Sequence, residues 1–545
     1  MVKKFGVWYT IKYYRVIQLA VFGIALLISK PYICKLLKHL CSFAKPTSKL
    51  YDNLNKIIPL ALLGLFMYTV YNVYQSRTYK YITGRNYSND HNNFNRSYNE
   101  LTKYFKDAEP HKLDMAEFPQ IEWKNAKGII FGKYGRQLIT IPSDSECNIA
   151  IFGPPGSGKT SGVAITNAME FEGSVLAVDI KGDVYNYVSK NSERKIVRFC
   201  PDSPTALKDS CHFDPLAGIN NMELTDRKLY IESMSIVLIA DEGGADSSYF
   251  TSRARKIFQG IAHLLLHENP DTSFPQLVHA ILKGNVFKWV EYAVSEQCTC
   301  ETAKELLASF LGNNEKNITA AYDVITTALV HFSNPVLDKL LDNKGGNCIS
   351  IKTLEDGYDI YLQISQEHLD AYAPLFTMII QSLSTAFTKR ADSSTGVKNR
   401  PILMLLDEFP QLTFTYKMIN SNLSTLRSKS VICMIIQQNL AQLEHRFQPT
   451  GARSIIGNCN YQIILGSNDI NSSKVYSDTF GVKKVLKVSN SQTFTDKATN
   501  SKSVQEATEK VFMPEYFGDL SAENKMIIYF KGKYCECSKI NCYKD

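Results

Sequence analysis

The sequence predicts an α/β fold with a mostly parallel sheet, an inserted all-α region and two membrane-spanning helices near the start of the chain. Three observations lead to this prediction. A glycine-rich loop at 153–160 follows the apolar run 148–152, a second apolar run at 402–406 ends in two acids, and residues 222–341 show helical periodicity with few strand signals. Apolar strands that alternate with helices are typical of parallel sheets, whose carboxyl ends carry ligands.

The composition indicates a folded protein with its basic charge at one end. Of the 545 residues, 44% are hydrophobic and 21% charged, which suits a large core and excludes general disorder. Residues 1–80 hold twelve Lys or Arg and one acid, Asp52. The net charge of residues 1–80 is therefore +11. Since the net charge of the whole chain is +8, the remaining residues carry −3. The overall charge is therefore no evidence for nucleic-acid binding by the main body of the chain.

Residues 1–80 are predicted to form a membrane anchor. Two nearly uncharged stretches, extended over about 15–33 and 57–74, are long enough to be transmembrane helices, with buried core helices as the alternative. Basic residues beside them would meet anionic lipid. The positive-inside rule does not decide the orientation, because the short loop between the stretches and the N-terminal tail are both basic. We place the large domain in the cytoplasm because its phosphate loop needs ATP.

Residues 81–117 are rich in Asn, Tyr and Ser, which predicts a linker or membrane-proximal stalk. The main domain is expected over 118–221 and 342–545, with the all-α region 222–341 inserted. It is expected to begin with a hairpin formed by 128–132 and 137–141.

The next segment is a complete phosphate-binding motif, G-x-x-x-x-G-K-[ST], between a predicted strand and a predicted helix at 161–171. Its glycines let successive backbone N–H groups point at phosphate oxygens, and the helix adds its positive dipole end. We predict that Lys159 binds the β- and γ-phosphates of ATP and that the Thr160 hydroxyl binds Mg²⁺. The predicted nucleotide-binding residues are Gly153, Pro154, Pro155, Gly156, Ser157, Gly158, Lys159, Thr160 and Ser161.

A second buried strand is predicted at 174–179. It ends in Asp179-Ile180-Lys181-Gly182-Asp183, which is either a plain polar turn or part of a site at the carboxyl edge. The region after it is helical, as the apolar stripe within 247–267 indicates.

The sheet then resumes, with strands expected at 358–364, 402–406, 431–436 and 461–465 and a helix at 373–389. The strand 402–406 leads into Asp407 and Glu408. A phosphate-loop site needs a carboxylate for Mg²⁺ and a base that orients water. We assign Asp407 to the metal and Glu408 to the base, with a solvated acidic turn as the alternative.

The C-terminal part contains a predicted mobile loop at 489–503 and a last strand at 526–530. The thiols of Cys535, Cys537 and Cys542 have no fourth ligand nearby, so they form a poor zinc pattern and are interpreted as reduced thiols.

These motifs together resemble the TraG/TraD (VirD-type) coupling-protein family of type IV secretion systems. The resemblance rests on the phosphate loop, on the segments 179–183, 213–216 and 405–409, on 435–443 and on 456–459, in the family's order. Two residues depart from the family pattern, Ile180 in place of Pro and Asp214 in place of Asn. No acidic extension follows the last strand, which puts substrate docking through such a tail in doubt.

The resemblance implies a P-loop (RecA-like) ATPase at the bacterial inner membrane that forms a homo-hexamer. It gives Gln437 the role of sensing the γ-phosphate or water, and Arg427 that of a finger reaching the neighbouring subunit's nucleotide. The implied partners are a DNA–relaxase complex with single-stranded DNA, and the ATPases and inner-membrane components of the secretion channel. A helix-capping Gln and a surface Arg remain open, as do export of protein effectors and a nucleotide-gated docking scaffold.

Overall fold

The computed structural model describes residues 112–241, 245–342, 348–493 and 499–543. The predicted transmembrane stretches, 15–33 and 57–74, and most of the predicted linker lie outside these ranges. Within them, no helix is both long and apolar enough to cross a membrane. Twelve strands of this described part form one sheet, in the order β1-β3-β2-β14-β13-β10-β4-β9-β8-β5-β7-β6.

The larger part of the sheet is parallel, which confirms the prediction of an α/β fold with a mostly parallel sheet. The parallel strands, in sheet order, are β10 (Tyr461–Ile464), β4 (Asn148–Phe152), β9 (Val431–Gln437), β8 (Ile402–Leu406), β5 (Ser174–Val178), β7 (Tyr358–Leu362) and β6 (Lys195–Phe199). The register pairs Phe152 with Gln437, and Val178 with both Leu406 and Leu362. The carboxyl ends of these strands therefore share one edge of the sheet.

The remaining strands are antiparallel and continue the sheet from β10. They are β13 (Lys525–Phe530), β14 (Lys533–Ser538), β2 (Ile129–Tyr134), β3 (Gln137–Ile141) and β1 (Gln120–Ile121). The predicted hairpin before the phosphate loop is confirmed as β2 and β3. The prediction that the strand at 526–530 is the last one is wrong. Lys531 and Gly532, with φ of 48° and 80°, make a tight turn that leads into β14.

Helices cover both faces of the sheet. Successive residues of a strand point to opposite faces, and the apolar side chains on each face are buried in a separate cluster. Leu403 and Leu405 belong to one buried cluster, whereas Met404 and Leu406 belong to the other. The helices beside the sheet are α5 (Ile165–Glu170), α6 (Asp183–Asn191), α7 (Ala206–Asp209), α15 (Ile351–Glu355), α16 (Leu369–Thr388), α17 (Tyr416–Thr425), α18 (Leu440–Gly457), α19 (Ile470–Thr479) and α20 (Tyr516–Ala522).

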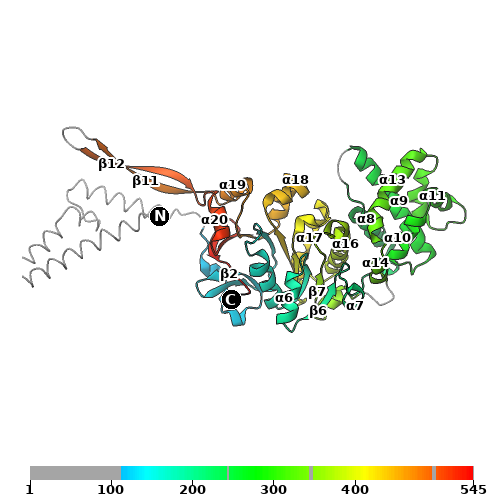
Figure 1. Cartoon of the computed structure of the whole chain (residues 1–545), viewed down its shortest axis with the longest axis horizontal. Helices are drawn as coiled ribbons and strands as arrows, with labels where there is room; N and C mark the ends of the chain where they lie inside the picture. The colour runs from blue at the N-terminus through cyan, green and yellow to red at the C-terminus, as the bar shows by residue number, and fades with distance from the viewer. Residues whose placement is uncertain (1–111, 242–244, 343–347, 494–498, 544–545) are drawn as a thin grey trace, which may run out of the picture. The chain divides into compact units, whose positions relative to one another are not determined.

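Between β6 and β7 the chain forms a helical region, as the periodicity predicted. Its helices gather around α9 (Figure 1), where Phe258 and Ile261 are fully buried. They are α8 (Leu224–Leu238), α9 (Ala245–Glu268), α10 (Phe274–Lys283), α11 (Val286–Val294), α12 (Glu301–Leu307), α13 (Glu315–Leu329) and α14 (Pro335–Leu340). The domain boundaries 118, 222 and 342 remain predictions.

The predicted mobile loop at 489–503 is wrong for its described residues. They belong to a two-stranded sheet of β11 (Val482–Thr493) and β12 (Thr499–Lys510), and Val511 N donates to Gly481 O at its base, at 3.1 Å. Strand pairing uses backbone groups, so a polar composition does not prevent it. Residues 485–506 fall in a compact unit separate from the one that contains 110–484 and 507–545.

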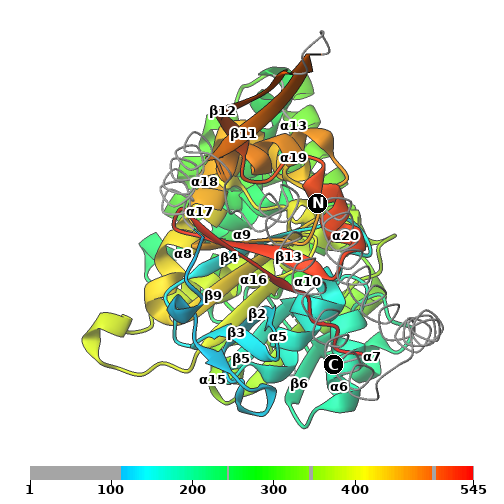
Figure 2. The ribbon, with the colours of Figure 1, turned by 90° about the vertical axis from the view of Figure 1, so that its left-hand side faces the viewer.

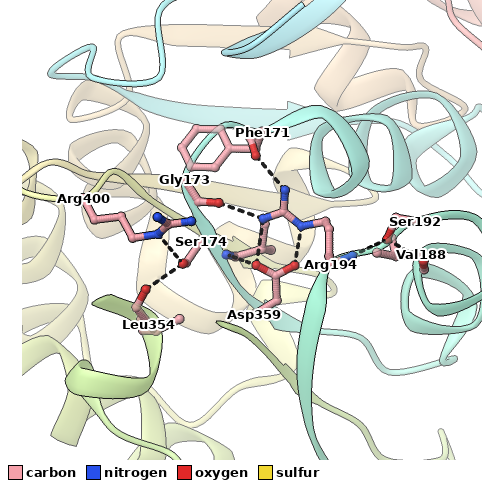
Figure 3. Close-up of polar contacts among 10 residues, drawn as sticks. Phe171, Gly173, Ser174, Val188, Ser192, Arg194, Leu354, Asp359 and Arg400 are labelled. Carbon is pink, nitrogen blue, oxygen red and sulfur yellow. Dashed lines mark hydrogen bonds and ion pairs between the residues drawn. The ribbon is translucent and has the colours of Figure 1, made fainter. Parts of the chain in front are cut away.

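A buried ion pair joins the amino ends of β5, β6 and β7 (Figure 3). Arg194 donates from Nε to Oδ2 of Asp359 at 2.5 Å and from Nη2 to Oδ1 at 2.8 Å. The same guanidinium donates to the carbonyl oxygens of Phe171 and Gly173, and Val175 N donates to Asp359 Oδ1. The pair thus fixes the edge of the sheet opposite to the carboxyl ends.

Candidate nucleotide-binding site

The glycine-rich loop leaves β4 and turns into a π-helix, η3 (Lys159–Ala164), before α5. Gly156 and Gly158 adopt φ of 77° and 95°, the left-handed region that favours glycine. A Cβ added at either would meet no atom within 4 Å, so the backbone here faces open space. The loop fits a phosphate cradle of backbone N–H groups.

Lys159 lies within this loop, with its side chain turned onto the loop itself. Its Nζ donates to the carbonyl oxygens of Gly153 at 2.7 Å and Pro154 at 3.2 Å. Burial lowers the pKa of Lys159, while the charges of Glu408 and Asp407 oppose that shift. A desolvated ammonium beside the cradle is suited to bind phosphate oxygens.

Asp407 and Glu408 follow β8 directly and are both buried, with 7% of each residue exposed. Glu408 adopts a left-handed conformation, φ 46°, and its N–H donates to Asp407 Oδ1 at 3.0 Å. Burial, and then the charge of Glu408, raise the pKa of Asp407 to about 7. The alternative of a solvated acidic turn is therefore wrong, because both carboxyl groups lie against the sheet.

Gln437 ends β9 between β4 and β8. It is fully buried, and neither its Nε2 nor its Oε1 has a hydrogen-bond partner among the described residues. A buried amide without a partner costs free energy, so it needs a functional explanation. It fits a group that binds a phosphate oxygen or the attacking water.

Gln438 is a site residue that the sequence reasoning missed. Its Nε2 donates to both carboxylate oxygens of Glu408, at 3.3 and 3.4 Å. Its position directly after Gln437 places it at the carboxyl edge, but nothing in the sequence identifies Glu408 as its partner.

The sequence left two alternatives for Asp179, a residue of a polar turn and a residue near the site, and its contacts agree with both. Its Oδ2 accepts from Tyr185 N at 2.8 Å and from Gln363 Nε2 at 3.3 Å, so it orders the turn before α6. Burial raises its pKa, and its charge also raises the pKa of Asp407. It therefore shapes the turn and lies near the acidic pair.

Arg427 does not join this group within one chain. It lies in the short helix Leu426–Lys429, which precedes the amino end of β9, the opposite edge of the sheet. Burial raises the pKa of Cys147 to about 12, and the nearby Arg427 charge opposes that rise. The Nε of Arg427 is buried without a hydrogen-bond partner among the described residues.

A magnesium ion with its nucleotide fits the donors at the loop edge. Within the described ranges, no cluster of three or more His, Cys, Asp or Glu side chains forms a complete protein cage for a metal. Mg²⁺ bound to nucleotides usually takes one or two protein ligands and fills its shell with phosphate and water. Asp407 and the Thr160 hydroxyl would supply those two ligands.

A parallel sheet, a phosphate loop after β4 and an acidic pair after β8, with β9 between the two strands, define a phosphate-loop nucleotide-binding protein. The family model described as type IV secretory system conjugative DNA transfer matches residues 113–545. The chain belongs to this family.

Two relatives give the range of similarity. Protein VirD4 of Rhizobium rhizogenes is 22% identical over 372 residues, which cover 66% of this chain and 53% of VirD4. Conjugal transfer protein TraG of Escherichia coli is 20% identical over 425 residues, covering 71% of this chain and 65% of TraG. The chain thus matches about half the length of VirD4.

Solved structures of the plasmid coupling protein TrwB share the fold. TrwB with the non-hydrolysable ATP analogue ADPNP has a TM-score of 0.57 and 14% identity, over 80% of this chain and 95% of TrwB. TrwB with ADP and Mg²⁺ has a TM-score of 0.54 and 15% identity, over 79% and 94%.

Proposed function

We propose that this protein is a membrane-anchored ATPase that acts as the coupling protein of a conjugative type IV secretion system. It recruits a DNA–relaxase complex and uses ATP hydrolysis to help transfer single-stranded DNA. The observation that supports this most is the meeting of Lys159, Asp407, Glu408 and Gln437 at one sheet edge. The family match and the nucleotide complexes of TrwB support it as well.

The residues divide the chemistry among them. Loop N–H groups and Lys159 hold the β- and γ-phosphates, and Asp407 and Thr160 hold Mg²⁺, which neutralises phosphate charge when bound. Glu408, held by Gln438, accepts a proton from the attacking water, and Gln437 orients that water.

The proposed assembly is a homo-hexamer at the bacterial inner membrane, anchored through 15–33 and 57–74, with the ATPase domain in the cytoplasm. Arg427 is absent from its own chain's loop edge, which suits a finger that acts on the neighbouring subunit's nucleotide. The proposed partners are the channel ATPases, the inner-membrane components and membrane lipid.

Two other functions share the same fold. A coupling protein for effector export would use the helical region as the surface that receives the effector. A nucleotide-gated docking scaffold would bind ATP and dock the substrate with little motor activity. The buried Glu408 with its Gln438 donor favours hydrolysis over the scaffold, because binding alone needs no base.

Lys159→Ala tests the proposal in cells. The substitution removes the phosphate-binding ammonium, so DNA transfer should be abolished while the protein still inserts into the membrane. Mating frequency and membrane fractionation measure the two outcomes. Normal transfer by this variant would overturn the proposed function.

A further inference from the structure

The C-terminal segment Ile540–Tyr543 lies against the helix that follows the phosphate loop. Cys542 N donates to Ser161 O at 3.1 Å, across most of the chain. Ser161 is the residue directly after Thr160 and lies within the π-helix η3. Helical turns of this wider kind are frequent at functional sites.

Gly162 makes this approach possible. A Cβ added there would lie 2.5 Å from the carbonyl oxygen of Ile540, which is too close for any side chain. The Ile540 side chain is 3% exposed and packs in the cluster beneath β2 and β3, with Ile130 and Leu138. The buried Ile540 side chain therefore fixes the start of the segment, and the backbone of the segment packs directly against η3.

The same segment also binds α6, the helix after the Asp179 turn. Tyr187 Oη donates to Cys542 O at 2.8 Å, and the rings of Tyr187 and Tyr543 meet edge to face with centroids 5.3 Å apart. Figure 2 shows the red C-terminal segment running down to α6. Three backbone or ring contacts thus tie the elements after β4 and β5 to each other through the C-terminal segment.

We propose that Ile540–Tyr543 is a positioning element for the phosphate loop, which holds the backbone at Ser161 so that Lys159 and Thr160 stand ready for the Mg²⁺–nucleotide complex. This inference rests on the proposed function, since it assumes that the loop binds a nucleotide. Because the contact is one residue from Thr160, loosening it acts on the Mg²⁺ ligand first.

The test compares nucleotide binding by full-length variants in lipid discs. A truncation after Asn541 removes residues 542–545, which include Cys542 and Tyr543, but keeps Ile540, and Gly162→Ala displaces the Ile540 carbonyl. Both should weaken the binding of a fluorescent ATP analogue by roughly 10-fold with Mg²⁺ present, which corresponds to about 1.4 kcal/mol of binding free energy. With EDTA in place of Mg²⁺ the loss should be smaller.

Two further variants separate the possible outcomes. Gly457→Ala adds a Cβ that meets nothing within 4 Å, so its Kd should equal the parent's. Tyr187→Phe removes only the hydroxyl that donates to Cys542 O, so its loss of affinity should lie between those of the parent and the truncation. It provides the test if the other variants fold poorly. Kd values equal to the parent's in folded variants, or losses that are the same with EDTA and follow the melting temperature, would overturn the inference. A parent that binds no nucleotide would instead refute the proposed function.

Discussion

Asp407 is the residue whose protonation most affects the site. Its pKa is raised from 3.8 to about 7, chiefly by burial and then by Glu408. The folded protein therefore keeps a proton that the unfolded chain releases, and the stability of the ligand-free protein falls as the pH rises from 3.8 to about 7. Metal binding needs the ionised carboxylate, so it should show the opposite trend.

We expect Mg²⁺-dependent nucleotide binding to weaken as the pH falls from about 8 to about 6, approaching a tenfold loss per unit below the pKa of Asp407. Fluorescent-nucleotide titrations across this range measure it. In Asp407→Asn the site lacks the titrating group, so the remaining affinity should vary much less with pH. Parallel pH profiles in parent and variant would show that Asp407 is not the group responsible.

The residues of the candidate site differ in how well the sequence alone predicts that they belong to it. The phosphate loop and Asp407-Glu408 were predictable because motif and strand end coincide, and Gln437 because the family resemblance names it. Gln438 was not, since its partner, Glu408, is 30 residues away and only the β8–β9 pairing brings them together. The tie between Cys542 and Ser161 depends on how the C-terminal segment crosses the sheet, which no local pattern specifies.

Among the elements, the buried parallel strands were the most predictable, because a strand covered on both faces is a continuous apolar run. β6 was missed, since Lys195 and the half-buried residues of this edge strand interrupt that pattern. The end of β11 and the start of β12 were predicted as part of the loop 489–503, because their sequence is polar. The edge of the sheet at the amino ends of β5, β6 and β7 is held instead by the ion pair of Arg194 and Asp359, which the apolar pattern of the strands does not predict.

Asp359→Asn should destabilise the protein by on the order of 3 to 5 kcal/mol, because it leaves the Arg194 guanidinium buried without its counter-charge. Thermal unfolding of the full-length protein in detergent measures the change. Glu305→Gln is the matched control. It breaks a surface pair with Lys228 whose side chains are 69% and 41% exposed, and it should cost about 1 kcal/mol or less. Equal melting temperatures for the two variants would contradict a structural role of the buried pair.

At the scale of the whole molecule, the charge distribution separates residues 1–80 from the rest of the chain. The segment 1–80 carries the excess of basic residues, and the remaining chain is slightly acidic. Attraction of DNA by overall charge is therefore not expected of residues 81–545, and a response to DNA would require local contacts or the proposed hexamer. This makes DNA dependence a demanding property to test.

The measurement that tests the central claim most directly is ATP hydrolysis by the full-length protein in lipid discs, with and without single-stranded DNA. The assembly state is verified in the same samples, and Lys159→Ala serves as the control. The proposed function predicts a rate that single-stranded DNA increases and that Lys159→Ala abolishes. A rate that DNA leaves unchanged in a verified ring would contradict the DNA-transfer motor and favour effector export or a scaffold.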